Sequence, residues 1–355
     1  MRPTGTYDTS YARDMAIVRT PLQWVMLAVF FAFLIAFPHF SGEYGLSVAT
    51  LTGITLIAVF GLHITTGLAG QINLGQSAFM AVGAYTSAIL TANLGAEWFL
   101  LVLPFAGIMA GVAGLIFGAP SLRVKELYLA MATLAAQFII IYIILRIDNL
   151  IGMKLTGGAL GFLVPWASIG GYVFDSTMAI YYLVAGMVVI AGLVARNITR
   201  SRVGRAFIAV RDNDLAAEVM GVNIYGYKLL AFFTGCFFAG IAGALWAHYL
   251  TYLNPDQFTL KDSVWWLGML IIGGMGSTLG AVMGTVFFKL LDVLTYYISP
   301  ALSAAFPQLP TNIYFAVSLV VFSLAIILFL IFEPRGLSHR WGIFKASYRL
   351  WPYSY

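Results

Sequence analysis

Long apolar runs separated by short polar gaps dominate the chain. A helix that crosses a bilayer needs about 20 mostly apolar residues. Runs of this kind lie near residues 22–38, 46–66, 77–93, 98–119, 127–147, 177–197, 227–250, 279–298 and 312–332. A shorter run at 263–275 ends in a glycine-rich stretch, as a half-helix or a short tilted span would. The pattern therefore predicts nine or ten membrane spans.

The apolar runs are expected to be helices. Their hydrophobic residues are continuous, whereas the strands of a membrane barrel alternate apolar and polar positions, and a helix satisfies its backbone groups internally. We predict an all-α polytopic membrane protein with an N-terminal arm at 1–21, a transmembrane domain at 22–338 and a tail at 339–355. The first run ends in FPHFSGEYG rather than in a small-residue cleavage site, which favours a retained helix over a signal peptide.

The composition agrees with a lipid environment. Only 9% of the residues are charged and 61% are hydrophobic, whereas a soluble domain carries roughly 25% charged residues. The composition therefore excludes a soluble enzyme. It also excludes a soluble nucleic-acid-binding domain, which the net charge of +5 would otherwise suggest. The lone cysteine, Cys236, lies in an apolar run and is expected to be a small packing residue rather than part of a disulfide or a zinc site.

The positive charges predict the orientation. Lysines and arginines gather in the arm, in the tail and in the gaps 120–126 and 198–226, and they are scarce in the gaps 39–45, 94–97 and 251–262. Positive residues collect on the cytoplasmic side of a membrane protein, so both termini are predicted to be cytoplasmic. The charge distribution fits this orientation best if the segment 263–275 also crosses the membrane, which gives ten spans. The glycine-rich segment 148–176 is too polar to span and falls on the outside.

One break in the apolar pattern is rich in amides. The stretch GLAGQINLGQSAFMAVGAY, residues 67–85, carries Gln71, Asn73, Gln76 and Ser77. Polar groups at a break in a membrane helix find partners in the protein or line a water-filled path. The amides could therefore satisfy loose backbone groups beside close-packing glycines, or they could line a transport route.

A second break in the later half of the chain favours the transport interpretation. GGMGSTLGAVMG, residues 273–284, includes Gly273, Gly274, Gly276 and Ser277. Glycine-interrupted apolar segments in the two halves of a chain are a sequence indicator of a transport pathway. We therefore assign both breaks to a candidate translocation pathway.

The longest polar segment on the predicted inner side is 201–228. Asp212, Asn213 and Asp214 offer capping oxygens for a short helix. Leu215, Val219 and Met220 would then share one side of that helix, and Gly221 suits its end. A short helix with an apolar stripe could insert into a groove on a partner. The alternative is an ordinary interfacial loop whose arginines, among them Arg205 and Arg211, only set the orientation.

An outer stretch, LTGGALGF at 155–162, is a third candidate. Thr156, Gly157 and Gly158 could form a turn that meets a substrate or a receptor, and a plain loop is the alternative.

Other chemistry is missing from the sequence. There is no G-x-x-x-x-G-K-[ST] motif to bind a nucleotide, and the four histidines are scattered with no H-E-x-x-H pattern. Ser277 and His248 could pair as in a membrane protease, but Ser277 lacks a G-x-S-G context. Lys289 and Asp292 could pair with each other, and no series of intramembrane acids suggests a proton relay. We expect no enzyme activity, no metal and no cofactor, with energy supplied by another protein.

Several stretches along the chain resemble the permease subunits of bacterial branched-chain amino acid ABC importers, of the LivM type. The similar segments are GLAGQINLGQSAFMAVGAY, PSLRVKELYLAMATLA, LTGGALGF, SRVGRAFIAVRDNDLAAEVMGVN, NPDQFTLKDSVWWLGMLIIGGMGSTLGAVMG and FEPRGL, over roughly residues 46–338. The chain departs from the family at Gln76, where relatives often carry His, and at Leu160, which is often polar.

The resemblance implies an ABC importer permease fold and a set of partners. Such permeases work with a second related permease, two cytoplasmic ATPases and an external substrate-binding protein. The segment matching the family's coupling helix runs from Asn213 to Gly221. Our coupling candidates are Arg205, Arg211, Asp212, Asn213, Leu215, Glu218, Val219 and Gly221.

The implied cargo is a branched-chain amino acid. Related importers carry urea, amides or other amino acids, so the same permease role with another small solute stays open. A self-sufficient channel or secondary transporter is the alternative of a different class.

Overall fold

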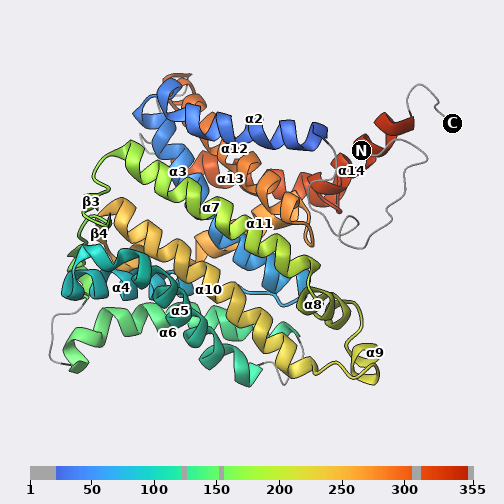
Figure 1. The fold of residues 1–355 in the computed structure, drawn as a ribbon, viewed down its shortest axis with the longest axis horizontal. Coiled ribbons are helices and arrows are strands. Elements are labelled where there is room, and N and C mark those ends of the chain that lie inside the picture. Colours follow the sequence, from blue (N-terminus) through green and yellow to red (C-terminus); the bar gives the residue numbers. More distant parts are fainter. Residues whose placement is uncertain (1–20, 122–125, 152–155, 306–312, 351–355) are drawn as a thin grey trace.

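The computed structural model describes residues 21–121, 126–151, 156–305 and 313–350. Most of the arm, the gap residues Arg123 and Lys125, and Leu155 of the outer stretch lie outside these residues. The described chain is almost entirely helical (Figure 1), which confirms the predicted all-α class.

Every apolar run of the sequence forms a helix. The nine longer runs correspond to α2 (Pro21–Phe40), α3 (Glu43–Leu62), α4 (Gln76–Leu94), α5 (Phe99–Ser121), α6 (Glu126–Ile151), α7 (Thr177–Arg200), α10 (Ile224–Leu250), α12 (Thr278–Ala305) and α13 (Ile313–Phe332). The shorter run is α11 (Leu260–Gly273), and α14 (Leu337–Leu350) follows α13 across the predicted tail boundary at residue 338.

Within the described residues, seven helices are long and apolar enough to cross a membrane, or eight if the bent pair 316–332 and 337–347 forms one span. This is slightly fewer than the nine or ten spans predicted. The difference lies in α2, whose described apolar stretch is the short Trp24–Phe40, and in α11. With 14 residues α11 is only about 21 Å long, too short to cross alone, which agrees with the expected half-helix.

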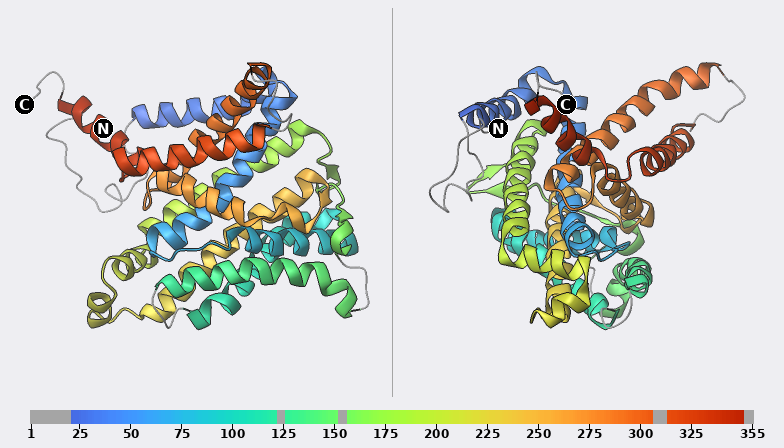
Figure 2. Two further views of the ribbon diagram at one scale, coloured as in Figure 1. Left: turned by 180° about the vertical axis from the view of Figure 1, so that it is seen from behind. Right: turned by 90° about the vertical axis from the view of Figure 1, so that its right-hand side faces the viewer.

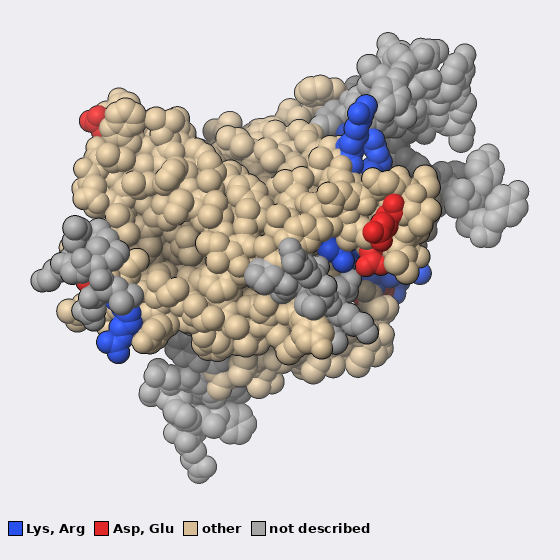
Figure 3. All heavy atoms as spheres, turned by 90° about the horizontal axis from the view of Figure 1, so that it is seen from below, with Lys and Arg blue, Asp and Glu red and all other residues tan. Residues whose placement is uncertain are grey.

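Helices α7 and α10 run in nearly the same direction in Figure 1, whereas α12 leans away from the bundle in the right-hand view of Figure 2. The short helices α8 (Arg202–Asp212) and α9 (Asp214–Val219) lie at one end, which we call the α9 end. Two small antiparallel two-stranded sheets lie at the other, the β end: β1 (Phe162–Leu163) pairs with β4 (Tyr252–Leu253), and β2 (Ser168–Ile169) pairs with β3 (Tyr172–Val173). Charged side chains lie toward the two ends of the face in Figure 3, with a broad uncharged band between them.

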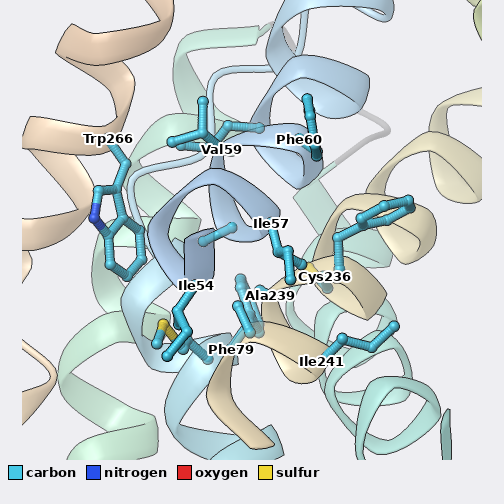
Figure 4. Close-up of a cluster of buried hydrophobic side chains, with 14 of the residues drawn as sticks. Ile54, Ile57, Val59, Phe60, Phe79, Cys236, Ala239, Ile241 and Trp266 are labelled. Atoms are coloured by element: carbon cyan, nitrogen blue, oxygen red, sulfur yellow. The ribbon is translucent and has the colours of Figure 1, made fainter. Parts of the chain in front are cut away.

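Helix α10 lies at the centre of the bundle and packs on α3, α4 and α5. Glycines let the backbones meet: a Cβ added at Gly83 of α4 would lie 2.3 Å from the Cα of Gly240, and one at Gly235 would lie 2.8 Å from the oxygen of Gly61. Small residues are needed where membrane helices approach this closely, because lipid supplies no hydrophobic drive for their association. Side chains such as Ile57, Phe79 and Ala239 fill the space around the crossings (Figure 4).

Two irregular segments interrupt the helices. The first, residues 69–75, follows a π-helical turn at His63–Leu68 and precedes α4. The second, residues 251–259, leads from α10 through β4 and a single 3₁₀ turn at Pro255–Gln257 into α11. Backbone groups in both segments lack helical partners, so side chains must supply them wherever the segments enter the membrane.

The α4–α10 crossing gives a direct test of the packing. Gly83→Leu is expected to destabilise the protein by about 1–3 kcal/mol or to prevent folding, because the new side chain would overlap Gly240. Thermal unfolding of the protein in detergent measures the effect. Gly186→Leu is the matched control, since Gly186 also lies within a long helix and has no atom near its Cβ position. Equal melting temperatures for the two variants would contradict the packing role.

Candidate functional site

The four polar residues of the first break are buried. Asn73 and Gln76 are 0% exposed, Ser77 is 1% and Gln71 is 2%. The Asn73 amide donates to Gln76 Oε1 at 2.8 Å, and Asn73 Oδ1 accepts from the Gly75 N–H. Gln76 in turn donates to the carbonyls of Ala58 in α3 and Gly235 in α10, at 3.0 and 3.4 Å. The two side chains thus connect the break to both neighbouring helices.

Helix α6 supplies the partners that the first turn of α4 needs. Thr133 Oγ1 accepts from the Leu74 N–H at 3.0 Å, and Gln137 Oε1 accepts from the Ala78 N–H at 3.0 Å. The Gln137 amide donates to the Phe258 carbonyl at 2.9 Å. One buried side chain therefore joins the start of α4 to the irregular segment that precedes α11.

The starts of α4 and α11 also touch directly. Ser263 Oγ, in the first turn of α11, accepts from the Ser77 N–H at 2.9 Å. Gln137 lies near the middle of the span Tyr128–Asp148, so this meeting point lies near mid-depth of the bundle. The N-terminal ends of two interrupted helices therefore meet at mid-depth, and helix N-termini carry partial positive charge that favours anionic groups. We call Gln76, Ser77, Gln137 and Ser263 the mid-depth polar layer.

Two buried atoms in this region keep spare hydrogen-bonding capacity. Ser77 Oγ and Gln71 Oε1 are buried with no partner in the described structure. The Gln71 amide nitrogen donates to the Lys228 carbonyl at 3.0 Å, so Gln71 lies against the start of α10.

The second break lies at the α9 end and not in the mid-depth polar layer. Ser277 begins α12, where its hydroxyl accepts from the Gly280 N–H at 3.3 Å. Gly273 packs on Gly280, and Gly274 packs on Gly336 at the start of α14. The break therefore forms a tight turn of a helical hairpin made by α11 and α12.

Arg211 joins the two breaks. The guanidinium of Arg211, in α8, donates to the Gly67 carbonyl at 2.8 Å, at the end of the π-helical turn that leads into the first break. A Cβ at Gly276 of the second break would lie 3.3 Å from Nη1 of the same guanidinium. Asp212 pairs with Arg211 at 2.8 Å and holds it in place. The structure thus places one coupling candidate, Arg211, against the turn that leads into the first break and against the second break.

The predicted short helix in the inner segment is α9. Asn213 caps it by accepting from the Ala216 N–H, and Gly221, with a φ of 83°, ends it. The N–H groups of Gly221 and Val222 bond back to the carbonyls of Glu218 and Ala217, a Schellman arrangement.

The expected stripe of α9 faces outward. Leu215, Val219 and Met220 are 72%, 87% and 83% exposed, and Glu218 is exposed beside them. Arg205, in α8, turns back to the Arg200 carbonyl at 3.3 Å.

The outer stretch folds over the β end. Thr156 is buried, and its hydroxyl donates to the Ile144 carbonyl of α6 at 3.0 Å. Gly157 and Gly158 have positive φ and form the turn before Gly161. Because Ile144 lies two turns from Gln137 on α6, this turn is about 10 Å above the mid-depth polar layer. Leu160, the family departure, is 84% exposed.

Sequence reasoning does not identify three polar residues of this site, Thr133, Gln137 and Ser263. Thr133 and Gln137 lie inside an apolar run and Ser263 is the first residue of one, so the only available signal is a polar residue within a predicted span. Among the described residues, no three His, Cys, Asp or Glu side chains are grouped closely enough to hold a metal ion.

Comparison with known proteins gives a consistent family. A family described as the permease component of branched-chain amino acid transport systems matches residues 44–332. The high-affinity branched-chain amino acid transport system permease protein LivM of Escherichia coli is 32% identical over 291 residues, covering 75% of this chain and 67% of the relative.

More distant relatives include a second type of permease. A probable branched-chain amino acid transport permease protein LivM of Methanocaldococcus jannaschii is 26% identical, covering 67% of each chain. The LivH permease protein of Escherichia coli is 24% identical over 68% of this chain and 80% of the relative. No solved structure matches the chain significantly.

Removing one amide tests the bonding of the mid-depth polar layer. Gln76→Leu would leave the carbonyls of Ala58 and Gly235 and the amide of Asn73 without this partner, so we expect a loss of about 1–3 kcal/mol in unfolding free energy. Thermal unfolding measures it. The control is Asn93→Ala, which removes an exposed amide that bonds only within its own helix. An unchanged melting temperature for Gln76→Leu would show that these bonds do not hold the break.

Proposed function

The chain belongs to the family of permease components of branched-chain amino acid transport systems, and we propose that it forms part of the translocation pathway of an ATP-driven importer for branched-chain amino acids. The observation that carries the proposal is the family match over residues 44–332. That range includes every apolar helix from α3 to α13 as well as α8 and α9.

The proposed assembly has several subunits. A second, related permease would complete the pathway, since relatives of both the LivM and the LivH type resemble this chain. Two ATPases would supply the energy, because the sequence has no nucleotide-binding motif of its own. A substrate-binding protein would deliver the amino acid at the β end. The α9 end would then face the cytoplasm of a bacterial cell, with both termini on that side and the spans in the inner membrane.

The exposed stripe of α9 is the proposed ATPase contact. Three large apolar side chains stand in solvent on a capped helix, as a groove-binding helix requires. Motion of α8 and α9 would reach the membrane through Arg211, which contacts Gly67 and Gly276 at the two breaks. ATP binding would thus bias two arrangements of the breaks, which open the route to opposite faces.

The proposed route passes the mid-depth polar layer. Gln71 and Asn73 border it in the segment before α4, and Gln76 and Ser77 border it at the start of α4. The turn at Thr156, Gly157 and Gly158 borders its outer end. Gly273, Gly274, Gly276 and Ser277 form its inner gate. What supports this is the meeting of two interrupted helices at mid-depth together with the unpartnered Ser77 hydroxyl.

Reconstitution in liposomes tests the function and the coupling together. We expect leucine uptake that requires ATP, the ATPases and the second permease, with no transport by this chain alone. The double variant Leu215→Asp, Glu218→Arg should lose at least ten-fold in uptake while the complex still hydrolyses ATP, because the α9 stripe no longer fits its groove.

Phe344→Asp is the control for this experiment, since Phe344 is also an exposed apolar residue but lies on α14, outside α8 and α9. Solute movement by the isolated chain would identify a channel or secondary transporter instead. Normal uptake by the double variant would remove α9 from the coupling.

Ser77→Ala tests the route separately from the fold. The Ser77 hydroxyl has no partner, and the bond to Ser263 uses the Ser77 backbone N–H, so the melting temperature should not change. Uptake of leucine should change several-fold if the solute passes this hydroxyl. Ser47→Ala, in the first turns of α3, is the control. Identical uptake by Ser77→Ala and the unmodified complex would place the route elsewhere.

A further inference from the structure

Lys289 lies in the middle of a membrane span. It is the twelfth of the 23 residues of the span Thr278–Pro300 in α12, and its side chain is only partly exposed. A lysine at this depth is costly, and such residues normally mark a substrate or ion pathway. The apolar residues around it, such as Phe288 and Leu291, cannot satisfy its ammonium group.

The neighbouring helix presents an acid at the same height. Helices α11 and α12 pack against each other around the turn at 274–277, where a Cβ on Gly284 would lie 1.9 Å from the Met269 carbonyl. Asp262 lies 11 residues before the end of α11, and Lys289 lies 11 residues after the start of α12. Both are therefore about 16 Å from the turn, at the same height on two helices that pack against each other.

The Lys289 ammonium keeps its bonding capacity. Within the described residues it has no hydrogen bond and no close ion pair. One oxygen of Asp262 already accepts from the backbone N–H and the hydroxyl of Thr259, as part of the capping box of α11. Asp262 is thus held in position through one carboxylate oxygen, and its other oxygen takes no part in the capping box.

Asp262 adjoins the mid-depth polar layer. Ser263 follows Asp262 in sequence and bonds to the Ser77 N–H. Asp262, Lys289 and the starts of α4 and α11 therefore lie at one level of the bundle. A fixed cation and a fixed anion at that level match the two charges of a zwitterion without adding net charge to the membrane interior.

We propose that Lys289 and Asp262 form a binding site for the head group of an amino acid, in which Lys289 holds the carboxylate and Asp262 holds the ammonium. The inference rests on the proposed transport function and adds to it the residues that meet the charged part of the cargo. The alternative is a structural role for Lys289, in an ion pair with Asp292, which lies three residues away on the same helix.

Binding of radiolabelled leucine to the assembled complex in nanodiscs, without the external binding protein, tests the site. We expect Lys289→Met to weaken leucine binding at least ten-fold and Lys289→Arg to preserve most of it. Leucinamide, which lacks the carboxylate, should compete at least ten-fold more weakly than leucine in the unmodified complex. In Lys289→Met that difference should vanish. Lys345→Met, which removes an exposed lysine of α14, is the control.

A charge exchange separates the site from a structural ion pair. Lys289→Asp combined with Asp292→Lys would restore leucine binding if the two residues only stabilise α12, and that result would overturn the proposal. Asp262→Asn retains an oxygen for the cap and should still weaken binding, which provides a second test if Lys289→Met fails to fold. If ATP-driven uptake proceeds normally in the complex with Lys289→Met, the proposed function stands and this inference falls; if the unmodified complex neither binds nor transports leucine, the proposed function itself fails.

Discussion

A backbone group that leaves a helix inside a membrane must find its hydrogen-bond partner within the protein. This constraint organises the polar chemistry of the chain. The segment 69–75 leaves α3 and enters α4 near mid-depth, and the side chains of Thr133, Gln137 and Ser263 bond its N–H groups and those of the first turn of α4. The same Gln137 also bonds the carbonyl of Phe258 before α11. Two interruptions far apart in sequence are therefore joined by side chains of α6 and by the bond between Ser77 and Ser263.

Close helix packing fixes where those interruptions lie. Glycines on α10 bring its backbone against α3, α4 and α5, so these helices cannot slide without a clash. The breaks interrupt the helices beside this packed centre, and Arg211 reaches the turn that leads into the first break from α8 with a bond to Gly67. This arrangement of a closely packed centre beside interrupted helices suits the proposed ATP-driven permease, because small motions of α8 and α9 would act on the breaks rather than on the core.

The proposed binding pair and the proposed route follow from the same arrangement. The half-helix α11 begins at mid-depth, so its N-terminus, its capping residues and the charges beside them lie there. A continuous span would present only side chains at that depth. Asp262 reaches that level because α11 begins there after the irregular segment 251–259. Lys289 reaches it because the turn at 274–277 returns the chain as α12.

The sequence by itself determined the class of protein, the position of every apolar helix and the short capped helix at 214–219, because these depend on continuous hydrophobic runs and on local capping chemistry. It also located both glycine-rich breaks and the chain's resemblance to its family. Only the tertiary structure decided which segments meet. The first break meets the start of α11 through Gln137 and Ser263. The second break meets Arg211 and α14 at the α9 end. Such pairings depend on how helices pack across long sequence separations, and a single polar residue within an apolar run carries no local sign of the partner it will bond.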